Sequence, residues 1–306
     1  PDASVQCCVT SPPYFGLRDY GVAGQIGLEP TPDDFVAEMV AVFRDVRRVL
    51  RDDGTLWLNL GDSYASTVKG SGGAGKSRLG PNRDLQNIGH QKFEPRRFDM
   101  QGLKPKDLIG IPWRVAFALQ ADGWCLRQDI IWHKPNPMPE SVKDRCTKAH
   151  EYIFMLSKSP RYYWDAEAVK EEVQHPEMRH KSSNKSAAQE SAFLGNAPTN
   201  LGRCGTSEDG KRNRRSVWTV STQPFKGSHF ATFPPDLIEP CILAGCPEGG
   251  TVLDPFGGAG TTGLVADRLQ RSATLIELNP DYAAMAERRI AREAGMLGAV
   301  DVETAA

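Results

Sequence analysis

The sequence predicts an α/β fold with a mostly parallel sheet and helices on both faces. Short apolar runs bounded by proline or glycine, typical of buried strands, occur along most of the chain. Between them lie longer segments in which apolar residues recur at helical spacing. Strands that alternate with helices usually pair in parallel, because the helix returns the chain to the starting edge of the sheet.

The first elements are clearly marked. Residues 5–10 form an apolar run that Ser-Pro-Pro ends, which predicts a buried strand. Thr31 can cap a helix with Pro32 in its first position. Asp52, Asp53 and Gly54 should end that helix, and residues 55–60 should form the next strand. One face of the helix carries Phe35, Met39, Phe43, Val46 and Leu50.

The alternation continues to the end of the chain. We expect helices near residues 106–121, 235–244 and 261–269 and from residue 281, and strands near residues 124–132, 152–157, 251–254 and 273–277. We find no internal repeat.

Composition excludes several classes of protein. The 306 residues are 40% hydrophobic and 25% charged, which is typical of a globular protein. No apolar run is long enough to span a membrane and no signal peptide is evident, so we expect a soluble, cytoplasmic protein. Seven cysteines without a C-x-x-C pair predict neither a disulfide framework nor a metal site. The chain begins without Met, and we expect that it starts within a domain.

Two stretches interrupt the alternation, and both are basic although the net charge is −1. Residues 66–106 contain nine Lys and Arg but three acidic residues, and residues 166–224 include the basic run 211–215. Each alone could be a solvated loop, but together they favour contact with phosphates. The candidate DNA-binding residues are Lys76, Arg78, Arg83, Arg96, Arg97, Lys211, Arg212, Arg214 and Arg215.

A glycine-rich turn follows the predicted strand 251–254, in the sequence Asp254-Pro-Phe-Gly-Gly-Ala-Gly260. Glycines let the backbone approach a ligand closely, and the following helix start offers free N–H groups to an anion. Glu277 lies at the end of the next strand, where its carboxylate could accept both ribose hydroxyls of a nucleoside. The alternative is a tight turn with a surface Glu.

The same glycines also fit the G-x-G-x-x-G fingerprint of dinucleotide-binding proteins, from Gly258 to Gly263. A nicotinamide-dependent oxidoreductase is therefore a competing hypothesis. Against it, the motif begins so late that too little chain follows to complete two mononucleotide-binding halves.

A second motif, Ser11-Pro12-Pro13-Tyr14, ends the first strand. Each proline fixes its own φ and keeps the preceding residue extended, so the Ser11 hydroxyl and the Pro12 carbonyl form a rigid pair of acceptors beside an aromatic ring. The exocyclic amino group of a nucleobase offers matching N–H donors and a flat face. Taken alone, the motif is more typical of a polyproline turn.

Together, the two motifs resemble the catalytic and cofactor motifs of the amino-group DNA methyltransferases, specifically the permuted β class. As in that class, the catalytic motif comes first and a target-recognition region lies between the two. Further similarity appears around Asp62, Lys134, Glu151 and Phe233. The resemblance implies a Rossmann-like methyltransferase fold whose seven-stranded sheet has one reversed strand. Residues 1–165 and 225–306 would form the catalytic and cofactor-binding domain, with the basic insertion 66–105, and residues 166–224 the target-recognition region.

The resemblance also implies S-adenosylmethionine as methyl donor. Glu277 would bind the ribose hydroxyls, the turn after Asp254 would lie under the nucleoside, and threonines with Phe233 would bound the methionine end. The cofactor-binding set is Asp254, Phe256, Gly257, Gly258, Gly260, Thr261, Thr262, Glu277, Asn279, Thr232 and Phe233. Members of the class also carry an acidic residue upstream of the catalytic strand that contacts the adenine, and this sequence does not include that segment.

The catalytic residues implied are Ser11, Pro12, Pro13 and Tyr14, acting on a base flipped out of double-stranded DNA. Ser in the first motif position favours cytosine N4 as the methylated atom, with adenine N6 as the alternative. Cytosine carbon-5 chemistry is disfavoured because its nucleophilic Cys is missing here: Cys241 follows a proline but in a predicted helix. A cognate restriction endonuclease would be a functional partner, and a catalytically inactive DNA-binding module is a remote alternative.

Three further polar residues have less certain roles. His133, His150 and Glu151 could form an acid–base set, but a structural role is favoured because the methylated amine loses its proton readily to water. The role of Asp62 stays open, since its strand end should face the same cleft.

Overall fold

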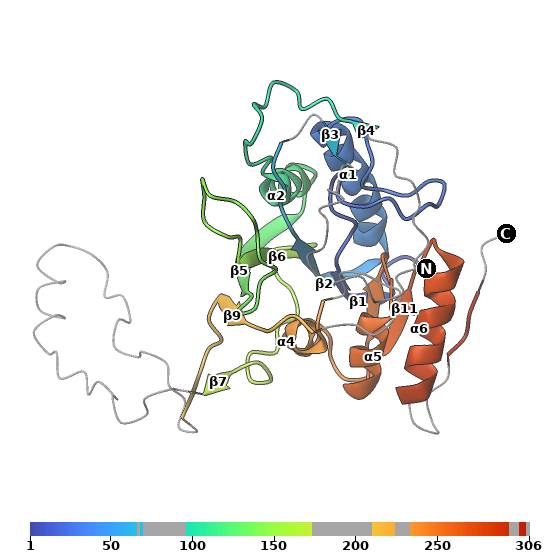
Figure 1. Cartoon of the computed structure of the whole chain (residues 1–306). Coiled ribbons are helices and arrows are strands. Elements are labelled where there is room, and N and C mark those ends of the chain that lie inside the picture. Colours follow the sequence, from blue (N-terminus) through green and yellow to red (C-terminus); the bar gives the residue numbers. More distant parts are fainter. Residues whose placement is uncertain (66–67, 70–95, 173–209, 224–232, 294–299, 304–306) are drawn as a thin grey trace, which may run out of the picture.

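The computed structural model describes residues 1–65, 68–69, 96–172, 210–223, 233–293 and 300–303 (Figure 1). Its centre is a seven-stranded sheet in the order β11-β10-β1-β2-β6-β5-β9. Only β6 runs antiparallel to its neighbours, and the other pairs are parallel. This confirms the predicted sheet with one reversed strand. In sheet order the strands are β11 (Ser272–Leu275), β10 (Thr251–Asp254), β1 (Val5–Thr10), β2 (Leu50–Leu60), β6 (His150–Ser157), β5 (Cys125–His133) and β9 (Val217–Thr219).

Helices cover both faces of the sheet (Figure 1). Successive strand residues point to opposite faces, so Cys8 packs with the first helix layer and Cys7 with the second. The first layer contains α1 (Pro32–Val49) and α2 (Ile111–Ala121), and the second contains α4 (Pro235–Gly245) and α5 (Thr261–Arg268), against which α6 (Pro280–Glu293) packs.

Two short hairpins lie outside the sheet. The first pairs β3 (Val68–Lys69) with β4 (Arg96–Arg97), and the second pairs β7 (Glu171–Glu172) with β8 (Lys211–Arg212). After the second hairpin the chain returns to the main sheet as β9, which pairs in parallel with β5.

Helix α1 begins as its sequence predicts. The Thr31 hydroxyl accepts the N–H of Asp34, Pro32 occupies the first turn, and the apolar face is buried. Its end differs from the prediction, because β2 begins at Leu50 rather than at residue 55. Leu50 pairs with Val5, and an irregularity before the Cys7–Thr55 pair accommodates the polar residues 51–54 within the strand.

Helix α2 begins five residues later than the predicted residue 106. The Asp62 carboxylate accepts the N–H groups of Gly110 and Ile111, at 3.0 and 3.1 Å, and so caps the helix from a distant part of the chain. Gly110 precedes the helix with φ +79°, which suits glycine. The open role of Asp62 is thus a helix cap.

Within the described ranges, no helix is long and apolar enough to cross a membrane, and no group of three or more His, Cys, Asp or Glu side chains could hold a metal ion. The six cysteines of these ranges are free thiols. Cys241 is buried within α4, as its sequence context predicts, and burial raises its thiol pKa strongly.

Candidate active site

The carboxyl ends of three parallel strands bring the two sequence motifs together. Ser11 follows β1, the glycine-rich turn follows β10 and Glu277 follows β11, and all three strands are neighbours in the sheet. A cavity of about 830 Å³, within the range of small-molecule sites, opens at this edge. Of the predicted residues, it is lined by Ser11, Pro12, Pro13, Tyr14, Phe233, Asp254, Phe256, Gly257, Gly258, Thr261, Glu277 and Asn279.

Backbone N–H groups hold the Glu277 carboxylate in place. Its Oε2 accepts the N–H of Gly258 and its Oε1 that of Asn279, each at 2.8 Å. Each carboxylate oxygen retains a further lone pair, and the side chain lines the cavity. Glu277 is therefore a fixed acceptor that can bind two neighbouring hydroxyl groups.

Asp254 links the two motifs through hydrogen bonds. Its carboxylate accepts the hydroxyls of Thr10 and Thr262, both at 2.6 Å, and the N–H of Phe256 at 3.0 Å. The residue is 1% exposed, and this burial raises its pKa to about 6 although the hydrogen bonds act in the opposite direction. Because Thr10 directly precedes Ser11, Asp254 fixes the Ser-Pro-Pro-Tyr motif relative to the glycine-rich turn.

Two predicted cofactor residues that the structure describes do not line the cavity. Thr262 is fully buried beneath Asp254. Gly260 has φ +75°, and a Cβ there would lie 2.9 Å from the Cβ of Ala286, so this glycine permits close packing of α6. Thr232 lies outside the described residues.

Aromatic and aliphatic side chains that the sequence analysis did not select form much of the cavity wall. Tyr20 and Tyr282 meet edge to face, with ring centroids 6.3 Å apart, beside Ile276 and Leu278. These apolar walls suit a flat heterocycle. A single aromatic residue forms no sequence motif, so the sequence did not point to Tyr20 or Tyr282. Ile276 and Leu278 could have been selected, because they stand on either side of Glu277.

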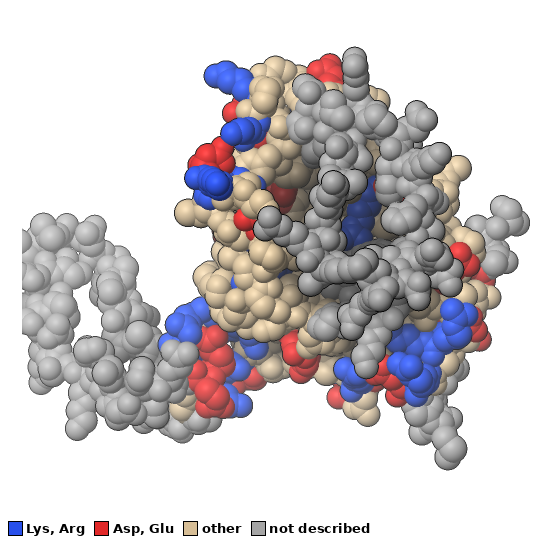
Figure 2. All heavy atoms as spheres, in the orientation of Figure 1, with Lys and Arg blue, Asp and Glu red and all other residues tan. Residues whose placement is uncertain are grey.

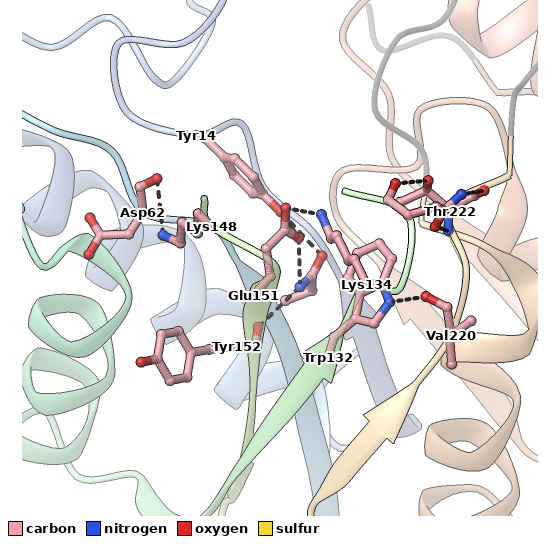
Figure 3. A network of polar contacts seen from close by, with 11 residues as sticks. Tyr14, Asp62, Trp132, Lys134, Lys148, Glu151, Tyr152, Val220 and Thr222 are labelled. Carbon is pink, nitrogen blue, oxygen red and sulfur yellow. Dashed lines mark hydrogen bonds and ion pairs between the residues drawn. The ribbon is translucent and has the colours of Figure 1, made fainter. Parts of the chain in front are cut away.

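A polar network surrounds Tyr14 (Figure 3). The Tyr14 hydroxyl donates to Glu151 Oε2 at 2.8 Å and lies 3.3 Å from the Asn59 side-chain oxygen. Glu151 forms an ion pair with Lys134, and their side chains are 15% and 17% exposed. The Lys134 ammonium also lies 4.1 Å from the centre of the Trp132 ring, which localises it further.

The two histidines of the possible acid–base set are arranged differently. His133 Nδ1 lies 3.1 Å from the Thr219 hydroxyl, and the His150 ring packs edge to face against Tyr152. Burial, then the charge of Lys148, lowers the pKa of His150. These contacts favour the structural role that the sequence suggested for both histidines.

The predicted DNA-binding residues are only partly described. Arg212 and Arg215 both form ion pairs with Glu171, at 2.9 and 2.7 Å, and Arg214 lies over the Trp218 ring. Among the described residues drawn in Figure 2, Lys and Arg lie beside Asp and Glu in several places. Arg96 and Arg97 form strand β4, while Lys76, Arg78 and Arg83 lie outside the described residues.

Comparison with known proteins agrees with this geometry. The sequence pattern of the DNA methylase family of N6/N4 methyltransferases matches residues 5–288. The chain is 50% identical to the type II methyltransferase M.SmaI of Serratia marcescens, over 94% of this chain and 84% of that protein. It is 49% identical to M.Cfr9I of Citrobacter freundii, over 96% of this chain and 83% of that protein.

Solved structures show the same fold. The PvuII DNA methyltransferase, described as cytosine-N4-specific, superposes with a TM-score of 0.58 over 94% of this chain and 80% of its own, at 19% identity. A DNA modification methylase of Thermus thermophilus, in complex with S-adenosyl-L-methionine, gives 0.57 over 97% and 89%, at 24% identity. The chain therefore belongs to the N6/N4 DNA methylase family, the amino-group DNA methyltransferases. Its relatives at about half identity are type II methyltransferases.

Proposed function

We propose that the protein transfers a methyl group from S-adenosylmethionine to the exocyclic N4 amino group of cytosine in double-stranded DNA. The observation that carries this proposal is the shared cavity. Ser11 and Pro12, with their acceptors, line it together with Gly258 and Glu277 of the nucleoside-binding side. Because its relatives are type II methyltransferases, we also propose that the protein functions together with a cognate restriction endonuclease.

The cofactor side of the cavity fits a nucleoside with a charged tail. Glu277 would accept the ribose hydroxyls, the backbone at Gly257 and Gly258 would lie under the nucleoside, and Tyr20 and Tyr282 would border the base. Phe233 and Thr261, which line the cavity, would bound the methionine end. When bound, S-adenosylmethionine supplies an activated methyl group on a sulfonium, so no covalent enzyme intermediate is required.

The substrate side must activate a poor nucleophile, because the lone pair of an exocyclic amine is delocalised into the ring. Hydrogen bonds from the two amino hydrogens to the Ser11 hydroxyl and the Pro12 carbonyl favour a pyramidal nitrogen. Its lone pair then points towards the methyl carbon, and alignment of the reactants lowers the barrier further. The nitrogen–carbon bond forms as the carbon–sulfur bond breaks, and the amine proton passes to water.

The base must leave the duplex to reach this cavity. Extrusion costs a few kcal/mol, which stacking on Tyr14 and phosphate contacts by the basic segments would offset. Within the family resemblance, Ser11 supports cytosine N4 over adenine N6 as the acceptor.

The decisive experiment incubates the protein with tritiated S-adenosylmethionine and DNA of mixed sequence, then digests the DNA to nucleosides for mass spectrometry. We expect N4-methylcytosine, and Ser11→Ala as a control should abolish most of the label. If N6-methyladenine is found instead, the methylated base is adenine rather than cytosine, and the reaction is still amino-group methyl transfer. The proposal would be overturned if the protein is folded and binds S-adenosylmethionine but leaves the DNA unlabelled.

A further inference from the structure

We propose that Glu151 is a positioning residue of the methyl-transfer site, which holds the Tyr14 hydroxyl and so fixes the Tyr14 ring where the target base stacks on it. This inference rests on the proposed function, because that function places Ser11 and Tyr14 against the base. It gives Glu151 a specific role in place of the general structural role that its sequence context favoured. Three observations lead to it, each from the network in Figure 3 and its surroundings.

The first step is the state of Glu151. Its carboxylate forms an ion pair with Lys134, and Lys134 is held in turn over the Trp132 ring. A carboxylate in such a pair carries no proton, so it can only accept hydrogen bonds. Glu151 therefore presents a fixed acceptor to Tyr14.

The second step is the proton of Tyr14. A phenol has one O–H, and the distance of 2.8 Å to Glu151 is shorter than the 3.3 Å to Asn59, as expected for a hydrogen bond to a charged acceptor. Burial, then the charge of Glu151, raises the pKa of Tyr14 well above its usual value, so the phenol keeps this proton. With its O–H donated to Glu151, the Tyr14 oxygen can only accept further hydrogen bonds.

The third observation concerns the Tyr14 ring itself. A Cβ at Gly61 would lie 2.4 Å from Cε2 of Tyr14, so the ring lies directly over the glycine backbone. The ring is thus held by Gly61 on its face and by Glu151 at its hydroxyl. These two contacts keep the Tyr14 hydroxyl in place when no base is bound.

The test measures turnover in a double-mutant cycle with Tyr14→Phe and Glu151→Gln. The phenylalanine keeps the ring but not the hydroxyl, and the glutamine keeps the shape but not the charge. We expect each single variant to lower kcat by about tenfold or more, since hydrogen bonds to charged groups are worth that much. The double variant should be no slower than the slower single variant, because both act through one hydrogen bond. Affinity for S-adenosylmethionine should stay unchanged.

Asp122→Asn is the matched control. Asp122 is also 15% exposed and paired with a cation, Arg44, but at the end of α2 away from the cavity lining. It should leave kcat at the wild-type value. If Glu151→Gln does not fold, as judged by thermal unfolding, Tyr14→Phe alone decides by its expected tenfold loss.

Independent, multiplicative losses in the double variant would overturn the inference, as would wild-type kcat in Tyr14→Phe or weaker S-adenosylmethionine binding that accounts for the loss. These results differ from a failure of the proposed function, in which the wild-type protein itself transfers no methyl group to DNA.

Discussion

Three carboxylates near the cavity have different tasks because their surroundings differ. Asp254 is buried and accepts two hydroxyls, so it fixes the backbone. Glu277 is held by two N–H groups and lines the cavity, where it can bind a ligand. Glu151 is paired with a lysine and acts on a neighbouring tyrosine. The same functional group thus serves support, binding and orientation within one site.

The burial of Asp254 predicts a pH-dependent stability. Its pKa is about 6 in the folded protein, against 3.8 when exposed, so the folded state holds the proton more tightly. The associated stability is complete below about pH 4 and is lost as the pH rises through about 6. We expect the unfolding free energy of the wild type, relative to Asp254→Asn, to fall by up to about 3 kcal/mol between pH 4 and pH 7. Urea denaturation of both proteins across this range is the measurement, and a constant difference would contradict the assignment.

Ser11 and Glu277 should separate chemistry from binding. Ser11→Ala removes an acceptor for the amine, so we expect kcat to fall by about a hundredfold or more with little change in S-adenosylmethionine affinity. Glu277→Ala should weaken that affinity by about tenfold or more and affect kcat at saturation less. Isothermal titration and single-turnover methylation give the two quantities, and equal effects of Ser11→Ala on both would count against its role.

At the level of elements, the packing of α6 depends on one glycine. Gly260 and Gly249 have nearly the same φ, +75° and +74°. A Cβ at Gly260 would strike Ala286, whereas one at Gly249 would meet nothing within 4 Å. We expect Gly249→Ala to cost about 1 kcal/mol of unfolding free energy from backbone strain alone. Gly260→Ala should cost about 1 to 3 kcal/mol more, because α6 must also move. Chemical denaturation of both variants tests this. Equal losses of unfolding free energy would show that α6 can move away from α5 without a further loss of stability.

Local sequence patterns predicted the elements whose ends are set locally. Strands β1 and β10 have the predicted bounds, and α1 has its predicted cap at Thr31. The start of α2 was predicted wrongly, because its cap is Asp62, 48 residues earlier in the chain. A contact of that kind depends on the assembled sheet and leaves no mark in the sequence around the helix.

The same distinction applies to the site. The proline motif and the glycine-rich turn need particular backbone conformations. Their residue types therefore allowed both to be selected from the sequence alone. The walls formed by Tyr20 and Tyr282 arise only when the loop after β1 meets α6. The link between Glu151 and Tyr14 likewise joins positions 137 residues apart.

At the level of the whole molecule, the net charge of −1 makes DNA binding depend on local basic segments. Reversing the charges across residues 211–215 should weaken DNA binding and flatten its dependence on salt, because fewer counterions are released. Since Arg212 and Arg215 share Glu171, Glu171→Gln should have the opposite effect and steepen that dependence. Fluorescence anisotropy between about 50 and 200 mM salt measures both slopes. Unchanged slopes in both variants would remove this run from the interface.

The order of the strands also governs how the protein is made. Strand β10, the sheet neighbour of β1, is translated more than 240 residues after β1. At about 5 to 20 residues per second, β1 waits for tens of seconds with one side unpaired. During that interval the nascent chain has the proposed base-binding motif after β1 but lacks the glycine-rich turn that is proposed to bind the methyl donor. Under the proposed function, the strand order itself therefore prevents DNA methylation by an unfinished chain.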